Sequence, residues 1–192
     1  MKIRPATPSD INSVAEIYND IHTLEEAGSF SIGWIRDVYP TSETARLALQ
    51  KGELFVEEDD DKIVGAAIIN QQQVDAYQGG KWQYDALDSE VMVLHTLVIS
   101  PQESGKGYGR NFVDFYEQYA LAHNCHYLRM DTNAKNGQAR AMYKKLGYNE
   151  IGIVPCVFNG IEGVQLVLLE KLIPLEGGRF KEDGNHADHD AR

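Results

Sequence analysis

The chain has 192 residues, of which 43% are apolar and 24% charged, proportions typical of one globular domain with a sizeable core. Its 18 Lys and Arg residues face 29 Asp and Glu residues, and this net charge of −11 argues against sequence-independent binding to nucleic acid or an anionic membrane. No apolar run approaches the ~20 residues of a membrane span, and no secretory signal opens the chain, so a cytoplasmic location is expected.

The first third of the chain predicts a short strand followed by two helices. Ile3 and Arg4 form the strand, and Ser9 or Asp10 caps a helix with apolar residues at helical spacing. A second helix follows residues 28–40, an irregular aromatic segment. It is capped by Thr41 or Ser42, runs through Lys51 and ends at Gly52.

Residues 53–58 and 62–70 predict two antiparallel strands. The acidic run 57–61 between them is expected to be a solvated hairpin tip, because consecutive carboxylates do not converge easily on a metal. A polar segment at 71–89 follows, with the aromatic residues Tyr77, Trp82 and Tyr84, and its length fits either a functional loop or a partly disordered segment.

The most informative segment is a glycine-rich turn at 104–110, between the strand predicted at 90–100 and an amphipathic helix. Gly105, Gly107 and Gly109 allow a tight main chain whose amides point at a ligand, and the helix start favours an anion such as pyrophosphate. Lys106 is followed by Gly107 rather than Ser or Thr, which argues against a nucleotide P-loop, and the glycine spacing differs from G-x-G-x-x-G.

A second motif lies at 136–148. Asn136 is a good helix cap, and Gly147 ends a helix whose apolar residues share one face: Ala139, Met142, Tyr143 and Leu146. By itself Tyr143 is most simply a packed core tyrosine.

The two motifs together resemble those of the GNAT superfamily of N-acetyltransferases. Ile99 to Gly109 matches the coenzyme A loop V-x-P-x-x-Q/R-x-x-G-x-G, except that Ser104 stands where Gln or Arg is usual, and 136–148 matches N-x-x-A-x-x-x-Y-x-x-x-G-[FY]. The resemblance implies an α/β (α+β) fold over residues 2–172, a mixed sheet of six or seven strands flanked by about four helices. Residues 1–173 would form this domain and 174–192 a flexible polar tail. Near-C-terminal residues 149–158 and 161–171 flank Asn159-Gly160, a hairpin signal that fits this fold.

The resemblance also implies acetyl-coenzyme A as cosubstrate, without a metal. Main-chain groups of the strand end would pair with the pantetheine arm and hold the thioester carbonyl, and the loop would bind the pyrophosphate. The implied cofactor-binding residues are Leu97, Val98, Ile99, Ser104, Gly105, Lys106, Gly107, Tyr108, Gly109, Arg110, Asn136, Ala139 and Tyr143.

Three residues are catalytic candidates. By resemblance, Tyr143 protonates the departing sulfur. His95, two residues before Leu97 and expected on the same strand face, is suited to remove the amine proton directly or through water, although a satisfied core histidine is the simpler reading. Glu90 is the second candidate base and also fits an ordinary exposed strand end.

These observations predict an enzyme that acetylates a primary amine on a small molecule or peptide. Trp34, Arg36, Tyr39 and Tyr84 are candidates to contact this acceptor, and packing of a lid explains the first three equally well. The alternative is a non-catalytic module that binds or senses acyl-coenzyme A. The sequence leaves open the acceptor, the acyl length and whether a homodimer completes the site. Cys125 and Cys156 read as reduced core residues, and a metal site at His186 and His189 is disfavoured.

Overall fold

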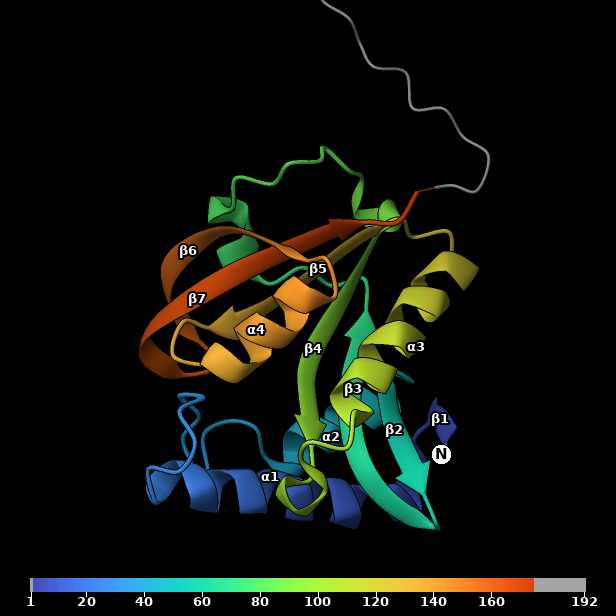
Figure 1. Ribbon diagram of the computed structural model, residues 1–192, viewed down its shortest axis with the longest axis vertical. Helices are drawn as coiled ribbons and strands as arrows, with labels where there is room; N and C mark the ends of the chain where they lie inside the picture. Colours follow the sequence, from blue (N-terminus) through green and yellow to red (C-terminus); the bar gives the residue numbers. More distant parts are fainter. Residues whose placement is uncertain (1, 175–192) are drawn as a thin grey trace, which may run out of the picture.

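The computed structural model describes residues 2–174, which form a seven-stranded sheet in the order β1-β2-β3-β4-β5-β7-β6 (Figure 1). β4 and β5 are parallel, and every other neighbouring pair is antiparallel. This confirms the predicted mixed sheet with helices. The elements are β1 (Lys2–Pro5), η1 (Pro8–Asp10), α1 (Ile11–Glu26), α2 (Ser42–Gln50), β2 (Leu54–Asp59), β3 (Lys62–Asn70), η2 (Asp75–Gly79), η3 (Asp88–Glu90), β4 (Val91–Ile99), η4 (Pro101–Glu103), α3 (Tyr108–Ala122), β5 (Tyr127–Asn133), α4 (Gly137–Lys145), β6 (Asn149–Phe158) and β7 (Ile161–Leu172).

The helices cover the two faces of the sheet in pairs. In β3, Ala66 and Ile68 pack with α1 and α2, whereas Ala67 and Ile69 pack with α3 and α4 on the opposite face. A third apolar cluster joins Tyr77, from the segment 71–89, to residues in the first half of β4 and along β7. Among residues 2–174, no helix has the length and apolarity needed to cross a membrane.

β4 and β5 pair for only four residues and then separate. Their register runs from Val91↔Tyr127 to Leu94↔Met130, after which β5 continues along β7 as far as Asn133. β4 continues along β3 to Ile99. The sheet therefore opens between these two strands.

A β-bulge in β4 lies just beyond the point of separation. Ile68 pairs with His95 and Ala66 pairs with Val98, so β4 has one extra residue opposite Ala67. Thr96 has a φ of 50°, a strained conformation for a β-branched residue.

The bulge overturns the prediction that His95 and Leu97 share a face. Leu97 packs with Met92 and Leu94 on the side of α3, whereas His95 lies opposite Ile68 on the other face. The inserted residue reverses the alternation on which that prediction depended.

Glu57 was wrongly predicted as part of a solvated tip. It is fully buried, its Oε1 accepts a hydrogen bond from Asn111 Nδ2 at 3.3 Å, and burial raises its pKa to about 7. The alternation of β2 turns Glu57 toward α3, because Val56 packs on the face of α1. Asp60 and Asp61, both with positive φ, form the turn itself.

The sequence of residues 127–130 predicts a short buried strand, and β5 extends three residues beyond it. Cys125 is buried and Cys156 half-buried, and both are free thiols. The tail predicted beyond residue 174, with His186 and His189, lies outside the described residues.

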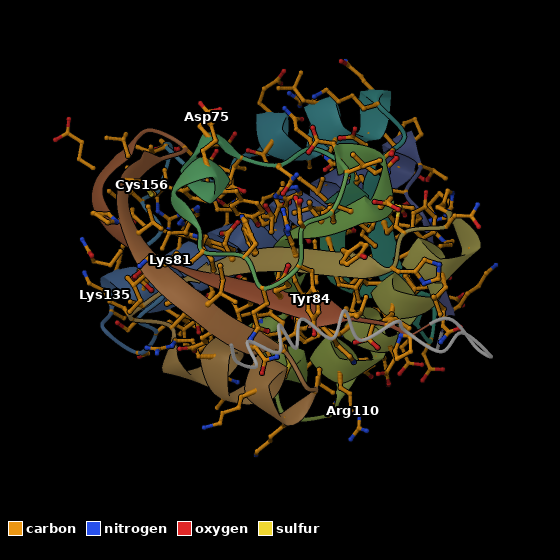
Figure 2. The ribbon with its side chains drawn as sticks, turned by 90° about the horizontal axis from the view of Figure 1, so that it is seen from above. Asp75, Lys81, Tyr84, Arg110, Lys135 and Cys156 are labelled. Carbon is orange, nitrogen blue, oxygen red and sulfur yellow. The ribbon has the colours of Figure 1, made fainter. Side chains whose placement is uncertain are left out.

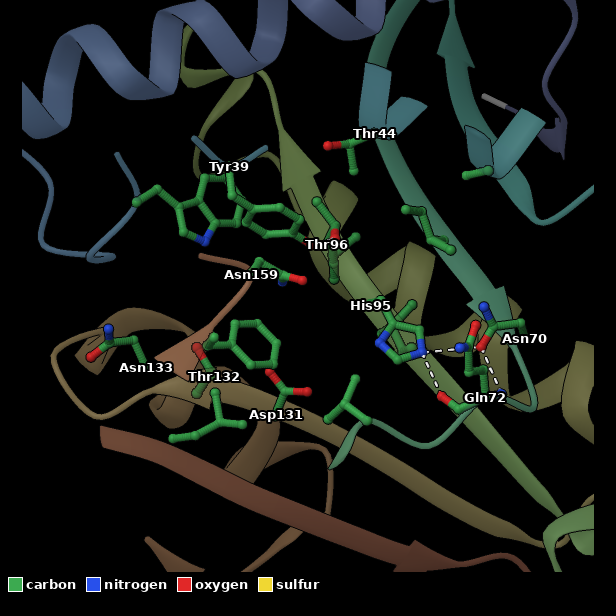
Figure 3. A pocket seen from close by; sticks show the side chains of 18 of the residues that line it. Tyr39, Thr44, Asn70, Gln72, His95, Thr96, Asp131, Thr132, Asn133 and Asn159 are labelled. Carbon is green, nitrogen blue, oxygen red and sulfur yellow. Dashed lines mark hydrogen bonds between the residues drawn. The ribbon is translucent and has the colours of Figure 1, made fainter. Parts of the chain in front are cut away.

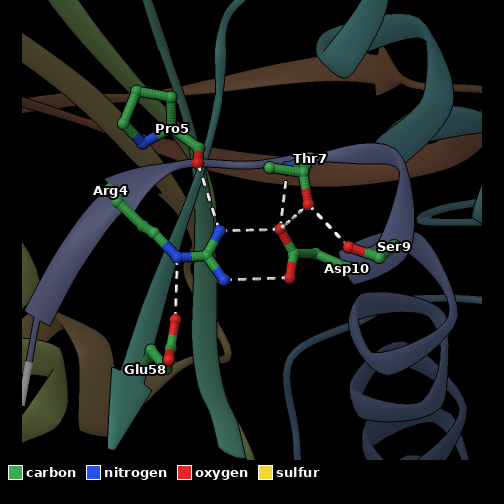
Figure 4. A network of polar contacts seen from close by, with 6 residues as sticks. All are labelled: Arg4, Pro5, Thr7, Ser9, Asp10 and Glu58. Atoms are coloured by element: carbon green, nitrogen blue, oxygen red, sulfur yellow. Dashed lines mark hydrogen bonds and ion pairs between the residues drawn. The ribbon is translucent and has the colours of Figure 1, made fainter. Parts of the chain in front are cut away.

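A partly buried ion pair connects β1 to the start of α1 (Figure 4). Arg4 donates from Nη1 and Nη2 to Asp10 Oδ2 and Oδ1 at 2.8 and 3.0 Å, and from Nε to Glu58 at 2.7 Å. The main-chain amide and hydroxyl of Thr7 also donate to Asp10. These charge-assisted bonds to Arg4 lower the pKa of Asp10 from 3.8 to about 2.

We expect Asp10→Asn to destabilise the protein by about 2 kcal/mol at pH 7, because the ionised form of Asp10 is favoured by folding. A lowered carboxyl pKa stabilises above the unfolded value, and this contribution is lost as the pH falls from about 4 to 2. Urea unfolding at pH 7 and pH 2.5 measures it, with Asp114→Asn, at an exposed site, as the control. An equal loss at both pH values would contradict the assignment.

Candidate functional site

A cavity of about 430 Å³ lies where β4 and β5 separate (Figure 3). Its walls come from the segment between α1 and α2, from α2, from the ends of β3, β4 and β5, from α4 and from the turn between β6 and β7. The lining includes Trp34, Tyr39, Lys51, Glu53, Asn70, His95, Thr96, Leu97, Asp131, Asn136, Ala139, Tyr143 and Phe158.

The glycine-rich turn presents an open main-chain surface at the start of α3. Gly105 and Gly107 have φ of 82° and 92°, and a Cβ at either position would meet no atom within 4 Å. Asn111 donates to the carbonyl of Gly107, so the amides before Asn111 precede the first turn of helical hydrogen bonds. Gly109 serves packing instead, since its Cβ would lie 3.2 Å from the sulfur of Met142 on α4.

The polar side chains of this turn either bind acidic side chains or lie at the surface. Lys106 pairs with Glu103, and Tyr108 donates to Asp59 at 2.7 Å. Figure 2 shows Arg110 at the outside of the molecule, where its Nε lies 3.9 Å from Asp114. The turn therefore offers an anion its main chain rather than a ready set of basic side chains.

Tyr143 reaches the cavity from α4. Its side chain is buried, and among residues 2–174 its hydroxyl has no hydrogen-bond partner. Burial, with the nearby charge of Asp131, raises its pKa well above 10, so the hydroxyl keeps its proton at neutral pH. Asn136 caps α4 by accepting from the amide of Ala139 at 3.1 Å, and both residues also line the cavity.

His95 is held by one ring nitrogen and exposes the other. Its Nε2 lies 3.0 Å from Asn70 Oδ1 and 3.1 Å from the carbonyl of Gln72. Asn70 Nδ2 donates to Glu53 at 2.9 Å, which makes Oδ1 the acceptor that faces His95. Nε2 therefore carries the proton, and Nδ1 is an acceptor that faces the cavity (Figure 3). Burial lowers the pKa of His95 to about 4.

Three of the catalytic and acceptor candidates lie outside this cavity. Glu90 accepts from the main-chain amide of Leu87 at 3.0 Å and is exposed at the end of η3, just before β4. Arg36 pairs with Glu26 at 2.7 Å on the surface. Tyr84 lies in the segment 71–89. Trp34 and Tyr39, by contrast, line the cavity as predicted acceptor contacts should.

Asp131 lines the cavity and was not predicted from the sequence as a site residue. It lies on the part of β5 beyond the predicted strand, opposite Leu168, and its Oδ2 accepts a hydrogen bond from the hydroxyl of Tyr77 at 2.8 Å. Burial raises its pKa to about 7. Asp and Asn are poor strand formers, so propensity places the end of the strand at Met130. The sequence contained one signal for Asp131: it is an acidic residue two positions after Arg129, and alternation places both side chains on the same strand face.

Within residues 2–174, no group of three or more His, Cys, Asp or Glu side chains is arranged to hold a metal ion. The sheet that opens beside a glycine-rich strand-to-helix turn, with a tyrosine facing the opening, fits the class of acyl-coenzyme A dependent transferases.

Comparison with known proteins identifies the family within that class. Residues 12–148 match the acetyltransferase (GNAT) family. The chain is 22% identical over 138 residues to a streptothricin acetyltransferase from Escherichia coli, covering 68% of this chain and 76% of that protein.

Solved structures agree with this match. A GNAT-family acetyltransferase from Streptococcus agalactiae has a TM-score of 0.76 at 24% identity, over 91% of this chain and 96% of that one. A Salmonella typhimurium acetyltransferase, determined with its cofactor acetyl-coenzyme A, has a TM-score of 0.64 at 18% identity, over 94% and 98% of the two chains. The protein belongs to the GNAT acetyltransferase family and is an acyltransferase whose family uses acetyl-coenzyme A.

We expect His95 to remain neutral, with its proton on Nε2, from pH 8 down to about pH 5, and to take a second proton near pH 4. Burial opposes its charged form, so protonation requires a lower pH than for an exposed imidazole. Ring ¹⁵N chemical shifts in a pH titration measure both the tautomer and the midpoint. A proton on Nδ1, or a midpoint near 6.5, would contradict this geometry.

Proposed function

We propose that this protein transfers the acetyl group of acetyl-coenzyme A to the primary amine of a small molecule or peptide. The observation that carries the proposal is the cavity at the strand separation, which contains a protonated Tyr143 from the α4 side and an acceptor nitrogen of His95 from the opposite face. Direct attack of an amine on a thioester needs one group to remove a proton and one to supply a proton.

The glycine-rich turn, the end of β4 and the start of α4 fit acetyl-coenzyme A, the proposed acetyl donor. The amides of 104–110 surround an open surface suited to a pyrophosphate. Leu97, Val98 and Ile99 lie on β4 beyond its pairing with β5, so their main-chain groups on that edge are available for the pantetheine arm. In this proposal Asn136 and Ala139 contact the donor from the start of α4.

In the transfer step, the neutral amine attacks the acetyl carbonyl carbon, a C–N bond forms and the C–S bond breaks. The nitrogen gives one proton to Nδ1 of His95 directly or to a water, and Tyr143 gives its hydroxyl proton to the departing sulfur. His95 then releases its proton to solvent, and solvent returns a proton to Tyr143. Main-chain groups of β4 beside Leu97 stabilise the charge that develops on the carbonyl oxygen.

Release of coenzyme A thiol from acetyl-coenzyme A is the direct test. The acceptor panel consists of alkyl diamines and polyamines, arylalkylamines, amino acids, aminoglycosides, and peptides with a free lysine or N-terminus. Turnover with one chemical class supports the proposal and identifies the acceptor class. Acetyl-coenzyme A binding without turnover across all classes would contradict it. The cytoplasmic location remains a prediction from the sequence.

Tyr143→Phe should lower kcat by about 10²-fold and leave the affinity for acetyl-coenzyme A nearly unchanged, because the variant removes one proton donor and little volume. Tyr148→Phe is the matched control: the two rings are 6.0 Å apart, but Tyr148 donates to Glu117 and lies outside the cavity wall. Equal kcat values for Tyr143→Phe and wild type would exclude Tyr143 as the acid.

Gly107→Ala should weaken acetyl-coenzyme A binding about tenfold or more, because a Cβ would enter the open surface and strain a φ of 92°. Gly163→Ala, in β7, is the control, since it has a φ of 70° and equally open surroundings away from the turn. Both variants should lose roughly 1–2 kcal/mol of stability. If calorimetry shows equal affinity for acetyl-coenzyme A in both, the pyrophosphate lies elsewhere.

A further inference from the structure

His95 and Asp131 occupy the first register position after β4 and β5 separate. The last paired positions are Val93↔Arg129 and Leu94↔Met130, so one further step along both strands reaches His95 and Asp131. By alternation both side chains lie on the face of Val93 and Arg129. Figure 3 shows them on opposite sides of the same cavity. Nδ1 of His95 and the carboxylate of Asp131 therefore face one cavity.

Asp131 differs from the paired carboxylates elsewhere in the protein. Asp10 has Arg4, Glu170 has Arg129 and Glu117 has Lys171 as a cationic partner. Within residues 2–174, Asp131 forms no ion pair, and the hydroxyl of Tyr77 occupies only its Oδ2. A partly buried carboxylate on a cavity wall, with an oxygen left for a ligand, is suited to bind a cation.

Aromatic rings form the neighbouring wall of the cavity. Trp34 and Tyr39 meet edge to face with centroids 6.1 Å apart, and Tyr39 meets Phe158 in the same way at 6.3 Å. The hydroxyl of Tyr39 bonds to the side chain of Thr96, which attaches this wall to the bulge in β4. Aromatic faces attract cations and also accommodate a short alkyl chain.

The segment 71–89 holds Tyr77 in place. Arg129 donates to Gln73 Oε1 at 2.6 Å and to the carbonyl of Tyr84 at 3.0 Å, and its guanidinium stacks 4.0 Å from the ring centre of Trp82. Glu170 accepts from the amide of Gln83 at 2.8 Å. The segment is thus bound to β5 and β7 by buried polar contacts.

We propose that the cavity recognises its acceptor as an alkylammonium ion, with Asp131 binding the ammonium group, Trp34, Tyr39 and Phe158 surrounding the adjoining alkyl chain, and Tyr77 positioning Asp131. This inference rests on the proposed function, because the bound ammonium is the group that is then acetylated. An acceptor with a carboxylate beside its amine is disfavoured, since it would bring a second negative charge to Asp131.

This arrangement implies an order of proton transfers. The ammonium gives one proton to the carboxylate of Asp131: an N–H bond breaks, an O–H bond forms, and the neutral amine remains in the cavity. After attack on the thioester, the nitrogen loses its second proton to His95 or water, and Tyr143 protonates the sulfur. Asp131 releases its proton to solvent. The overall reaction gives an amide, a free thiol and one proton.

Several titratable groups surround Asp131. Burial, together with the charge of Asp131, raises the pKa values of Tyr39, Tyr77, Tyr143 and Cys156. The pKa of His95 is lowered to about 4. Lys51 and Glu53 also line the cavity, and Glu53 accepts from Asn70. Asp131, with a pKa of about 7, changes charge near neutrality.

The test measures binding of n-pentylammonium by calorimetry on the full chain saturated with coenzyme A, with n-pentanol as the uncharged probe. Affinity for n-pentylammonium should rise about 30-fold from pH 5.5 to pH 8.5, in proportion to the ionised fraction of a carboxyl with a pKa of about 7. Affinity for n-pentanol should not change with pH.

Asp131→Asn should abolish this pH dependence and weaken n-pentylammonium binding at pH 8.5 by at least tenfold. Asp75→Asn is the matched control, because it removes an exposed carboxylate two residues from Tyr77. The thermal midpoint of Asp131→Asn at pH 8.5 should equal or exceed that of wild type, because the substitution removes a charge that is costly to bury. This result separates lost recognition from failed folding.

Tyr77→Phe tests the positioning role. The hydrogen bond from Tyr77 favours ionised Asp131, so its removal should raise the carboxyl pKa, followed by ¹³C NMR, and shift the binding midpoint to higher pH. A purely structural role for Tyr77 would lower stability without moving this midpoint.

Each outcome decides between the two proposals. Equal n-pentylammonium affinity in wild type and Asp131→Asn, or affinity independent of pH, would overturn the ammonium site even if amines are acetylated. If Asp131 binds n-pentylammonium but no amine is acetylated, the ammonium site is supported and the proposed transfer reaction fails.

Discussion

The structure depends above all on the separation of two parallel strands after four paired residues. The strands diverge because each follows a different antiparallel neighbour: β4 stays with β3 to Ile99, and β5 stays with β7 to Asn133. The divergence leaves main-chain N–H and C=O groups without a strand partner. Such groups cost free energy when they are buried without a hydrogen bond. In the proposed function, the pantetheine arm of acetyl-coenzyme A enters this cavity and pairs with these groups. Tyr143 and His95 both face the cavity because it forms where the two strands stop pairing.

The two faces of the sheet contribute different chemistry to that opening. The face of α3 and α4 carries the glycine-rich turn and the buried hydroxyl of Tyr143, while the opposite face carries His95, Asp131 and the aromatic wall. The bulge at Thr96 makes this division sharper, since it sends His95 and Leu97 to opposite faces within three residues. The proposed donor and acceptor therefore approach from opposite sides and meet in the plane of the sheet.

The sequence predicted most of the fold because the determining signals are local. The glycine turn, the helix at 136–148 and the Asn159-Gly160 hairpin each have a short-range physical cause, and each is found at the expected position. The predictions that were wrong or missing concern features that depend on contacts with other strands or with a distant helix. The bulge depends on the register between β3 and β4, Glu57 is buried by a contact with Asn111 of a distant helix, and Asp131 continues its strand only because β7 supplies partners. Of the candidate site, Tyr143, His95, Trp34 and Tyr39 could be found from sequence; Asp131 required the topology.

The buried pair of Arg129 and Glu170 has a consequence for how this enzyme diversifies. Arg129 and Asp131 are adjacent on one face of β5, so the anchor of the segment 71–89 and the acid that Tyr77 contacts keep a spacing fixed by the strand pleat. Exposed residues of the segment, such as Gln78, Lys81 and Asp85, can change without altering this spacing. We expect changes of acceptor among related sequences to be concentrated at such exposed positions of residues 71–89.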